Sequence, residues 1–395
     1  MLRGVGGQRK LLAFVLLAFF LVYWIPFSNA FPAWVPLQFG SYRIFQATTI
    51  AMWAIVALGL NLLTGYNGQI SLGHGAFVAL GGYTSAILMF DHGWPFWATI
   101  PVAGLLTGAV GFVVGVPALR LTGPYLAIAT MALALSTPQI LQKYEGLTHG
   151  SQGINVDTPK PPGILDGDLV HWLNMNETQY LYFLALLVAA IMTIIAWNIV
   201  RSRIGRAFVA IRDSEIAAQA MGISVPRFKT MAFAISAFFA GICGGVYVQV
   251  IGFVSPRSFD VFQSINYLTT IVVGGLASIL GSILGAAVFV LVPEVNTLLE
   301  KLHLPQANQA PDVLYGISLI LVMIFMPYGF AGFIRRLGRL QPASMAQSVS
   351  GFFGQLGLRV RTIRSNPGDG STASSPGKGS PNPGGSDGKN QGGSP

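Results

Sequence analysis

Charged side chains are scarce in this chain of 395 residues. Asp, Glu, Lys and Arg together make up 9% of it, against about 25% in soluble domains, whereas hydrophobic residues make up 52%. A helix that crosses a bilayer needs about 20 mainly apolar residues. Several stretches without a charged residue reach that length: 44–90, 121–142, 178–200, 230–256, 261–293 and 313–334. These runs exclude an ordinary soluble protein, and they are too long and unbroken for an outer-membrane β-barrel. We therefore expect an all-α polytopic membrane protein.

Two further absences limit the chemical roles that this chain can have. Cys243 is the only cysteine and lies in an apolar run, so no internal disulfide can form. No carboxylate, Lys or Arg falls inside a predicted span, where such costly groups serve proton relays, and His74 is the only candidate. Neither a Ser-His-Asp arrangement nor a metal-ligand spacing is present. If the chain moves a solute uphill, we expect the energy to enter from outside the chain, although sodium sites built from carbonyls and hydroxyls would leave no trace in the sequence.

The placement of charge predicts the topology. Lys and Arg cluster in three ranges, 3–10, 201–229 and 335–364, which the positive-inside rule assigns to the cytoplasm. The long segment 142–179 is mainly acidic, so we expect it to face outside. The net charge of +9 is interpreted as topology signals and attraction to anionic lipid. Nucleic acid is not an expected partner, because no soluble domain is present to hold it.

The uncharged runs predict about ten transmembrane or half-length helices, with both termini in the cytoplasm. The stretch 265–292 would form a helix of about 42 Å, which is longer than a bilayer requires. Two cytoplasmic termini require an even number of crossings, so we expect this stretch to break at its glycines into two half-length helices. The remaining predicted spans are 11–25, 44–63, 71–90, 97–117, 122–141, 180–200, 231–251 and 313–330. The first is interpreted as an uncleaved span, with a signal peptide cut after Ala30 as the alternative.

The composition divides the chain into three parts. Residues 1–340 form the predicted transmembrane domain. In 341–364, apolar residues alternate with arginines, which favours an amphipathic helix at the membrane surface. Residues 365–395 are rich in Gly, Ser and Pro, so we expect this tail to be disordered. Within the first part, the outside segment 142–179 contains several prolines and is predicted to be an extended loop rather than strand.

Small residues recur at four-residue intervals inside the predicted spans. Such stripes let two helix backbones approach closely, either for ordinary tight packing or for helices that slide against each other. The stripes are Gly104-Gly108, Gly111-Gly115, Ala237-Gly241-Gly245 and Gly274-Ser278-Ser282-Ala286.

Residues 201–229, here called the charged insert, separate two long apolar runs. The sequence Glu215-Ile-Ala-Ala followed by Gly222 predicts a short helix that presents two alanines and ends on glycine, which suits insertion into a cleft on a partner. The residues assigned to this contact are Arg206, Arg212, Glu215, Ala217, Ala218 and Gly222.

Residues 67–75, here called the polar segment, form the densest polar cluster beside a predicted span. Their glycines permit a broken helix with exposed N–H groups that can meet a carboxylate. His74 is either part of a substrate pathway or a hydrogen-bonded residue of the helix bundle. The sequence Thr122-Gly-Pro-Tyr125 is either a second break that lines the path or only the entry of the next span, since Pro fits the first turn of a helix. The candidate pathway residues are Asn67, Gly68, Gln69, Ser71, Gly73, His74, Gly75 and Tyr125.

Four motifs resemble the membrane permeases of branched-chain amino-acid ABC importers. They are the sequence from Gly59 to Phe77, Gly123-Pro-Tyr-Leu-Ala-Ile-Ala-Thr130, Ser202-Arg-Ile-Gly-Arg206 and Val272-Val-Gly-Gly-Leu-Ala-Ser278. The resemblance covers roughly residues 40–335. The Glu215 to Gly222 sequence is similar to the motif that docks on the ATPase, although it reads Glu-Ile-Ala-Ala where the family has Glu-Ala-Ala.

The resemblance implies a transport subunit of a bacterial plasma (inner) membrane importer rather than an enzyme. It implies two separate ABC ATPase subunits that bind ATP, a second homologous permease and a periplasmic or lipoprotein solute-binding protein. No cofactor is expected in this chain. Branched-chain or related small amino acids are the expected substrates. The alternatives are urea or short amides, which other members of the family carry, and a self-contained secondary carrier or channel for which the insert is only a loop.

Overall fold

In the computed structural model, the residues described are 41–118, 121, 123–156 and 177–301, together with 320 and 329. The chain divides into two units, Met1–Leu337 and Gly338–Pro395, and all described residues belong to the first. The predicted first span, nearly all of the last span, the surface helix and the tail lie outside the described residues.

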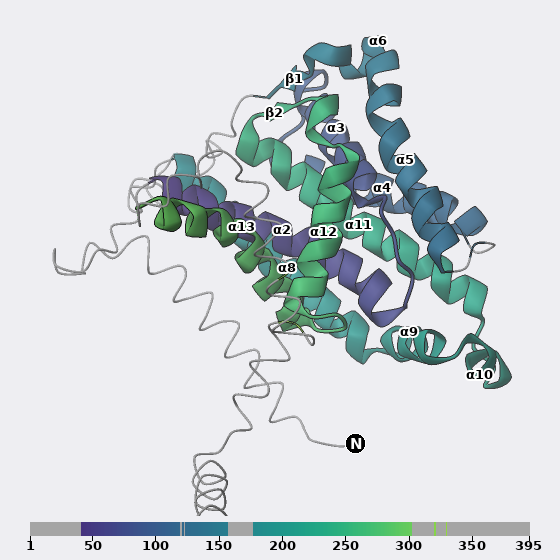
Figure 1. Cartoon of the computed structure of the whole chain (residues 1–395). Helices are drawn as coiled ribbons and strands as arrows, with labels where there is room; N and C mark the ends of the chain where they lie inside the picture. Colours follow the sequence, from purple (N-terminus) through teal and green to yellow (C-terminus); the bar gives the residue numbers. More distant parts are fainter. Residues whose placement is uncertain are drawn as a thin grey trace, which may run out of the picture. The chain divides into compact units, whose positions relative to one another are not determined.

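The described part is almost entirely helical (Figure 1). Its one sheet is a two-stranded antiparallel ribbon, in which Ile154 pairs with Val254. In chain order, the elements are α2 (Ser41–Asn61), the π-helical turn η1 (Leu62–Tyr66), α3 (His74–Phe90), α4 (Phe96–Ala118), α5 (Pro124–Lys143), α6 (Glu145–Thr148), the 3-10 turn η2 (Gly150–Gln152), β1 (Ile154–Asn155), α8 (Glu177–Arg201), α9 (Arg203–Asp213), α10 (Glu215–Ala220), α11 (Val225–Ile251), β2 (Phe253–Val254), η4 (Pro256–Ser258), α12 (Val261–Gly274) and α13 (Ile279–Lys301).

Several of these helices are long and apolar enough to cross a membrane. Five qualify singly within the described residues, and a sixth is counted if the bent pair α12 and α13 is one span. They coincide with the predicted spans at 44–63, 97–117, 122–141, 180–200 and 231–251. α3 is apolar but shorter, at 17 residues. The predicted total of about ten helices and the sides of the two termini are not decided by these residues.

The stretch 265–292 is broken, as its length predicted. α12 and α13 meet at an angle of 120°, and the break falls between Gly274 and Ile279. The prediction of two half-length helices is wrong for the second of them, because α13 has 23 residues and continues to Lys301. The glycines of this uncharged stretch therefore indicated where the helix breaks. The end of the stretch did not indicate where the second helix ends.

Two connecting segments contain regular structure. The connection after α2 begins as the π-helical turn η1, because the Asn67 and Gln69 backbone amides donate to the carbonyls of Leu62 and Leu63. The outside segment was predicted to be an extended loop, but its described residues include α6, η2 and β1. β1 forms because β2, from a distant part of the chain, provides a partner for its backbone groups.

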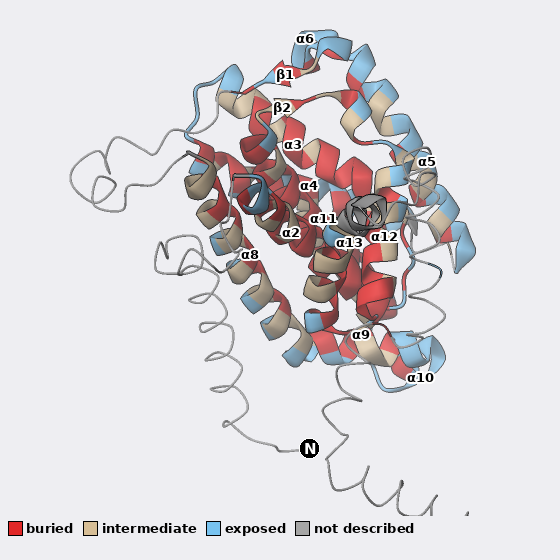
Figure 2. Cartoon of the chain, turned by 60° about the vertical axis from the view of Figure 1, so that its left-hand side comes forward, coloured by how far each residue is buried: buried red, intermediate tan, exposed pale blue. Residues whose placement is uncertain are grey.

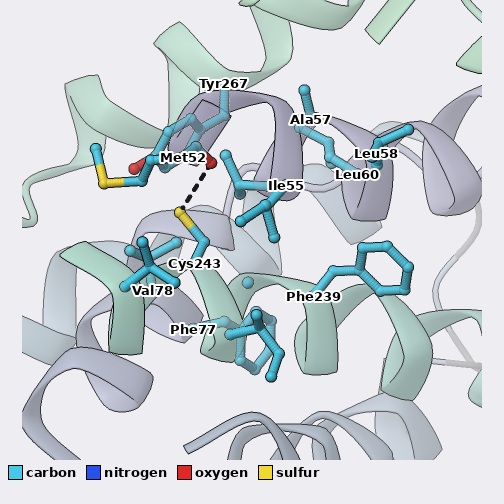
Figure 3. Packing of buried hydrophobic residues seen from close by; sticks show 14 of the residues in the cluster. Met52, Ile55, Ala57, Leu58, Leu60, Phe77, Val78, Phe239, Cys243 and Tyr267 are labelled. Atoms are coloured by element: carbon cyan, nitrogen blue, oxygen red, sulfur yellow. Dashed lines mark hydrogen bonds between the residues drawn. The ribbon is translucent and has the colours of Figure 1, made fainter. Parts of the chain in front are cut away.

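Helix α11 is the centre of the fold. It packs most extensively against α4 and then against α3 and α2. Figure 2 shows buried residues concentrated where α2, α3 and α11 meet, whereas much of α5, α6 and α10 is exposed. In Figure 3, Cys243 of α11 lies among apolar side chains of neighbouring helices, and its thiol donates to the Met52 carbonyl at 3.4 Å. The expectation of a buried, unbridged cysteine is confirmed.

The glycine stripes are the reason that these helices approach so closely. Lipid tails are as apolar as leucine, so helices in a membrane associate mainly through close packing. A Cβ added to Gly81 of α3 would lie 2.5 Å from the Cα of Gly241 in α11. A Cβ on Gly241 would lie 2.6 Å from the Thr107 side chain of α4. The predicted stripes on 104–115 and 237–245 thus face each other across the α4–α11 contact.

The charged insert and the structured part of the outside segment lie at opposite ends of the helices. Figures 1 and 2 place α9 and α10 at one end and α6 with the β1–β2 ribbon at the other. This arrangement agrees with the opposite charge of the two segments and with their predicted assignment to opposite sides of a membrane.

Substitution of the packed glycines is expected to destabilise the helix bundle. Gly81→Ala places a methyl group against backbone atoms of α11 that cannot rotate away, so we expect a cost of about 1–3 kcal/mol. The measurement is thermal unfolding of the purified protein in detergent. Gly146→Ala is the matched control, because a Cβ there meets nothing within 4 Å. Equal unfolding temperatures for the two variants would contradict the close-packing argument.

Candidate functional site

The charged insert folds into two short helices because each begins at a serine that caps it. The Ser202 hydroxyl accepts a hydrogen bond from the Ile204 amide at 3.1 Å, and the Ser214 hydroxyl accepts one from the Ala217 amide at 3.3 Å. Both serines have the extended backbone that capping residues favour. After α10 the chain turns at Gly222, whose φ of +80° is a left-handed conformation that glycine adopts without steric cost.

The two helices of the insert have a buried and an exposed side. α9 buries Phe208 and Ile211, and Ala218 of α10 packs against Ile211 and Val225. In contrast, Ile216 of α10 and Met221, directly after it, have 82% and 83% of their surface exposed. Only one of the two predicted alanines is therefore on the surface, since Ala217 is exposed and Ala218 is buried.

Two of the predicted contact residues bind to elements other than the two short helices, Glu215 to α11 and Arg212 to η1. The Lys229 ammonium lies 2.5 Å from a Glu215 carboxylate oxygen, and the two side chains are 11% and 47% exposed. Arg212 pairs with the neighbouring Asp213 and also donates from Nη1 to the Gly65 carbonyl at 3.0 Å. Arg206 is exposed and donates to the Arg201 carbonyl at 3.1 Å. Gly222 is exposed, with nothing near it.

The polar segment crosses between helices that lie far apart in the sequence. The Leu72 amide donates to the Thr130 hydroxyl of α5 at 2.9 Å, and the Gly75 amide donates to the Ser264 hydroxyl of α12 at 2.8 Å. Gly73 allows this approach, because a Cβ there would lie 2.9 Å from the Thr130 carbonyl oxygen. Ser71 is fully buried and accepts from the Gly73 amide.

His74 is buried at the first turn of α3. Its Nε2 lies 2.6 Å from the Ser236 hydroxyl of α11, which itself donates to the Gly59 carbonyl at 2.7 Å. A hydroxyl has one hydrogen, so His74 is the donor in the first contact, and in the neutral ring Nδ1 then carries a lone pair. No described residue donates to that Nδ1. His74 thus links α3 to α11 and keeps one acceptor free inside the bundle.

The polar segment and the charged insert meet at one small pocket. The Gln69 side-chain amide donates to Asn67 at 2.9 Å and reaches the Lys229 carbonyl at 3.4 Å. These residues line the pocket with Gly68, Ile70, Leu121, Gly123, Leu126 and Glu215. Its volume of about 40 Å³ holds a few water molecules but no amino acid. Tyr125 is not part of it, since its side chain is 68% exposed on α5.

Sequence reasoning missed two residues that organise this region, Asn61 and Lys229. Asn61 is buried in an apolar helix and forms three hydrogen bonds across to the α12–α13 break. The sequence contained a signal for Asn61, because a lone side-chain amide in a long uncharged run needs hydrogen-bond partners.

Within the part of the chain that the structure describes, no three His, Cys, Asp or Glu side chains are grouped as metal ligands would be.

A protein-family profile described as "Branched-chain amino acid transport system / permease component" matches residues 42–323. This range is well over half of the chain. The chain belongs to this family of branched-chain amino-acid permeases. The resemblance inferred from the four motifs is thereby confirmed, and the family is one of transport subunits rather than enzymes.

Curated relatives of this permease agree with the family. It is 34% identical over 313 residues to the high-affinity branched-chain amino acid transport system permease protein LivM of Salmonella typhimurium, covering 75% of this chain and 71% of LivM. LivM of Escherichia coli K12 is also 34% identical over 313 residues. The permease protein LivH of Escherichia coli K12 is 26% identical over 303 residues, covering 73% of this chain and 94% of LivH. No solved structure matches the permease.

The Glu215–Lys229 pair gives an asymmetric prediction. Glu215→Ala leaves a nearly buried ammonium without its carboxylate, whereas Lys229→Met leaves a half-exposed carboxylate that water can solvate. We expect Glu215→Ala to cost roughly 1–2 kcal/mol more locally, which corresponds to about tenfold faster amide hydrogen exchange in 214–222. Hydrogen exchange followed by mass spectrometry measures this. The double variant should exchange like Lys229→Met, and equal exchange in both single variants would contradict the argument.

Proposed function

We propose that this permease is one of two membrane subunits of an ATP-driven importer in a bacterial plasma membrane, and that it moves branched-chain or related small amino acids into the cytoplasm by alternating access. ATP is bound and hydrolysed by two separate ABC ATPase subunits, so this chain needs no cofactor of its own. A periplasmic or lipoprotein binding protein delivers the substrate. The second membrane subunit is a homologous permease.

The observation that carries the proposal is the exposed side of α10. Ile216 projects from this capped helix and Met221 from the residue directly after it, at the end of the molecule opposite to α6. Large apolar side chains that are almost fully exposed are typical of anchors that enter a pocket on a partner. The underside of the same helix is fixed by Ala218 and by the Glu215–Lys229 pair, so it is preorganised for docking. These features support the ATPase as the partner.

The second permease is supported by the exposed helices and by the relatives. The outward side of α5 is apolar, with Tyr125, Ile128, Leu135 and Ile140 exposed. In a membrane such a face contacts lipid or another apolar helix bundle. The relatives include two different permease proteins of branched-chain amino-acid transport systems, LivM and LivH. We therefore propose a pair in which this chain takes the LivM-like position.

The choice of substrate rests on the relatives and on the lack of charge. The curated relatives that match over about three quarters of the chain are branched-chain amino-acid permeases. No Asp or Glu lies between residues 44 and 90 or between 230 and 256, so the candidate pathway offers a neutral path for a zwitterion. A urea or short-amide substrate would also tolerate such a path and is the alternative to be separated by experiment.

Transport by the assembled complex tests the proposal directly. Proteoliposomes would contain this chain, the second permease and both ATPases, with binding protein outside and ATP inside. We expect accumulation of labelled leucine, isoleucine or valine, no accumulation of urea, and no uptake when ATP or the ATPases are omitted. Concentrative uptake by this chain alone would overturn the importer proposal in favour of a self-contained carrier.

Charge introduced at the exposed side of α10 is expected to prevent ATPase docking. Ile216→Asp or Met221→Asp would bury a carboxylate in an apolar pocket, so we expect at least tenfold less ATPase to copurify with the permease. Leu147→Asp is the matched control, because Leu147 is also an exposed apolar side chain but belongs to α6 at the opposite end. Undiminished ATPase recovery with Ile216→Asp would remove the docking role of this surface.

Gly222 gives a second test of the same segment. Nothing lies within 4 Å of a Cβ at this position, so its φ of +80° is the only obstacle to a side chain. Asn tolerates left-handed backbone far better than a β-branched residue does. We expect Gly222→Val to lower ATP-driven uptake at least tenfold at equal membrane abundance, and Gly222→Asn to lower it much less. Equal activity of the two variants would contradict a conformational role for Gly222.

A further inference from the structure

A chain of contacts leads from the charged insert to the break between α12 and α13. Its first member is Arg212, on α9. Beyond its exposed pairing with Asp213, Arg212 donates a charge-assisted hydrogen bond to the Gly65 carbonyl in η1 at 3.0 Å. Gly68 makes room for the Arg212 side chain, because a Cβ there would lie 2.9 Å from the Arg212 Cγ. The insert is thus attached to the end of α2.

The second member is Gly65, which lies between Arg212 and Asn61. A Cβ on Gly65 would overlap the Asn61 side-chain oxygen and lie 2.5 Å from the Ala277 backbone nitrogen. No residue with a side chain fits this position without displacing Asn61 or the break. Gly65 therefore packs directly against both Asn61 and the linker of the break.

The third member is Asn61, which binds the linker of the break and the first turn of α13. Its Oδ1 accepts from the Ala277 amide at 2.9 Å, and its Nδ2 donates to the Ser278 carbonyl at 2.9 Å and to the Ser282 hydroxyl at 2.8 Å. Both amide hydrogens of the buried side chain are used. Ala277 has a φ of +55°, an unfavourable value for a residue with a side chain, so the break depends on such contacts for its geometry.

We propose that Arg212 and Asn61 are positioning residues that carry movement of the ATPase-docking insert, through Gly65, to the α12–α13 break. The inference rests on the proposed function, because the ATPases supply the movement. The break is the element that changes arrangement: two helices meet at 120° across a short linker, and a change in that angle moves a whole helix. A second attachment, from Gln69 to the Lys229 carbonyl, keeps the polar segment next to the same insert.

Labelling of a cysteine in the break tests the inference. Leu276 lies in the linker and is exposed, so Leu276→Cys accepts a maleimide, whereas the native Cys243 is buried and unreactive in the folded protein. The labelling rate is measured in the assembled complex with and without ATP. We expect ATP to change the rate at least fivefold. In the Arg212→Ala and Asn61→Ala backgrounds, compared with the unaltered background at equal amounts of bound ATPase, we expect a change of less than twofold and a loss of uptake.

Three further variants separate transmission from folding. Arg203→Ala removes a charge from the same helix without touching η1 and should keep the full ATP effect. Arg212→Lys retains a donor for the Gly65 carbonyl and should recover part of it. The double variant Arg212→Ala, Asn61→Ala should show the same ATP-dependent change in labelling rate as either single variant, because loss of either residue already breaks the same series of contacts. If Asn61→Ala does not fold, Ser282→Ala weakens the same contact more mildly and should reduce the ATP effect partly.

The outcomes distinguish the inference from the proposed function. If ATPases copurify and hydrolyse ATP while Arg212→Ala keeps both the ATP-dependent labelling and the uptake, the inference is overturned and the importer proposal stands. The inference is also overturned, and the importer proposal stands, if the labelling rate in the unaltered background does not change with ATP although uptake proceeds. If no ATPase binds the unaltered permease, the proposed function fails and the inference fails with it.

Discussion

The close contact of α11 with α3 and α4 determines where everything else in this permease can lie. Gly241 has no side chain on a surface that meets Gly81 on one side and Thr107 on the other, so three backbones come within reach of one another. Helix association in lipid depends on such packing because lipid provides no hydrophobic driving force between helices. α11 begins at Val225, inside the charged insert, and its fixed position therefore fixes Lys229 and Ser236, which bind Glu215 and His74.

The interior of the bundle is neutral but not apolar. Amides and hydroxyls such as Asn61, Gln69 and Ser236 are buried, and each is paired with a backbone group or another polar side chain. A buried polar group without a partner is costly in a low-dielectric surrounding, so these contacts specify which helices meet and in which register. Among the described residues, this pairing is incomplete at His74 Nδ1 and Asn67 Nδ2, which belong to the candidate pathway, and also at polar atoms of Tyr83, Thr107 and Gln249 outside it.

The charged insert and the polar segment are in direct contact. Glu215 and Lys229 belong to the segment that we assign to the ATPase, whereas Asn67 and Gln69 belong to the segment that we assign to the substrate path, and the four residues line one pocket. Such proximity suits a transporter in which nucleotide-driven movement must reach the substrate path. The rigid contacts through Gly65 extend the connection to the broken helix, so a small displacement of the insert has a defined route into the bundle.

The sequence by itself determined the properties that depend on local composition and spacing. Uncharged runs placed the spans, the charge clusters marked the insert, and small residues at four-residue intervals marked the α4–α11 contact, because each of these signals is carried by neighbouring residues on one helix. Only the tertiary structure decided which helix each stripe or polar group would meet. Asn61 binds residues more than 200 positions away, Ala218 faces inward and β1 has β2 as its partner, since such pairings depend on how whole helices are arranged. Periodicity within one helix contains no information about that arrangement.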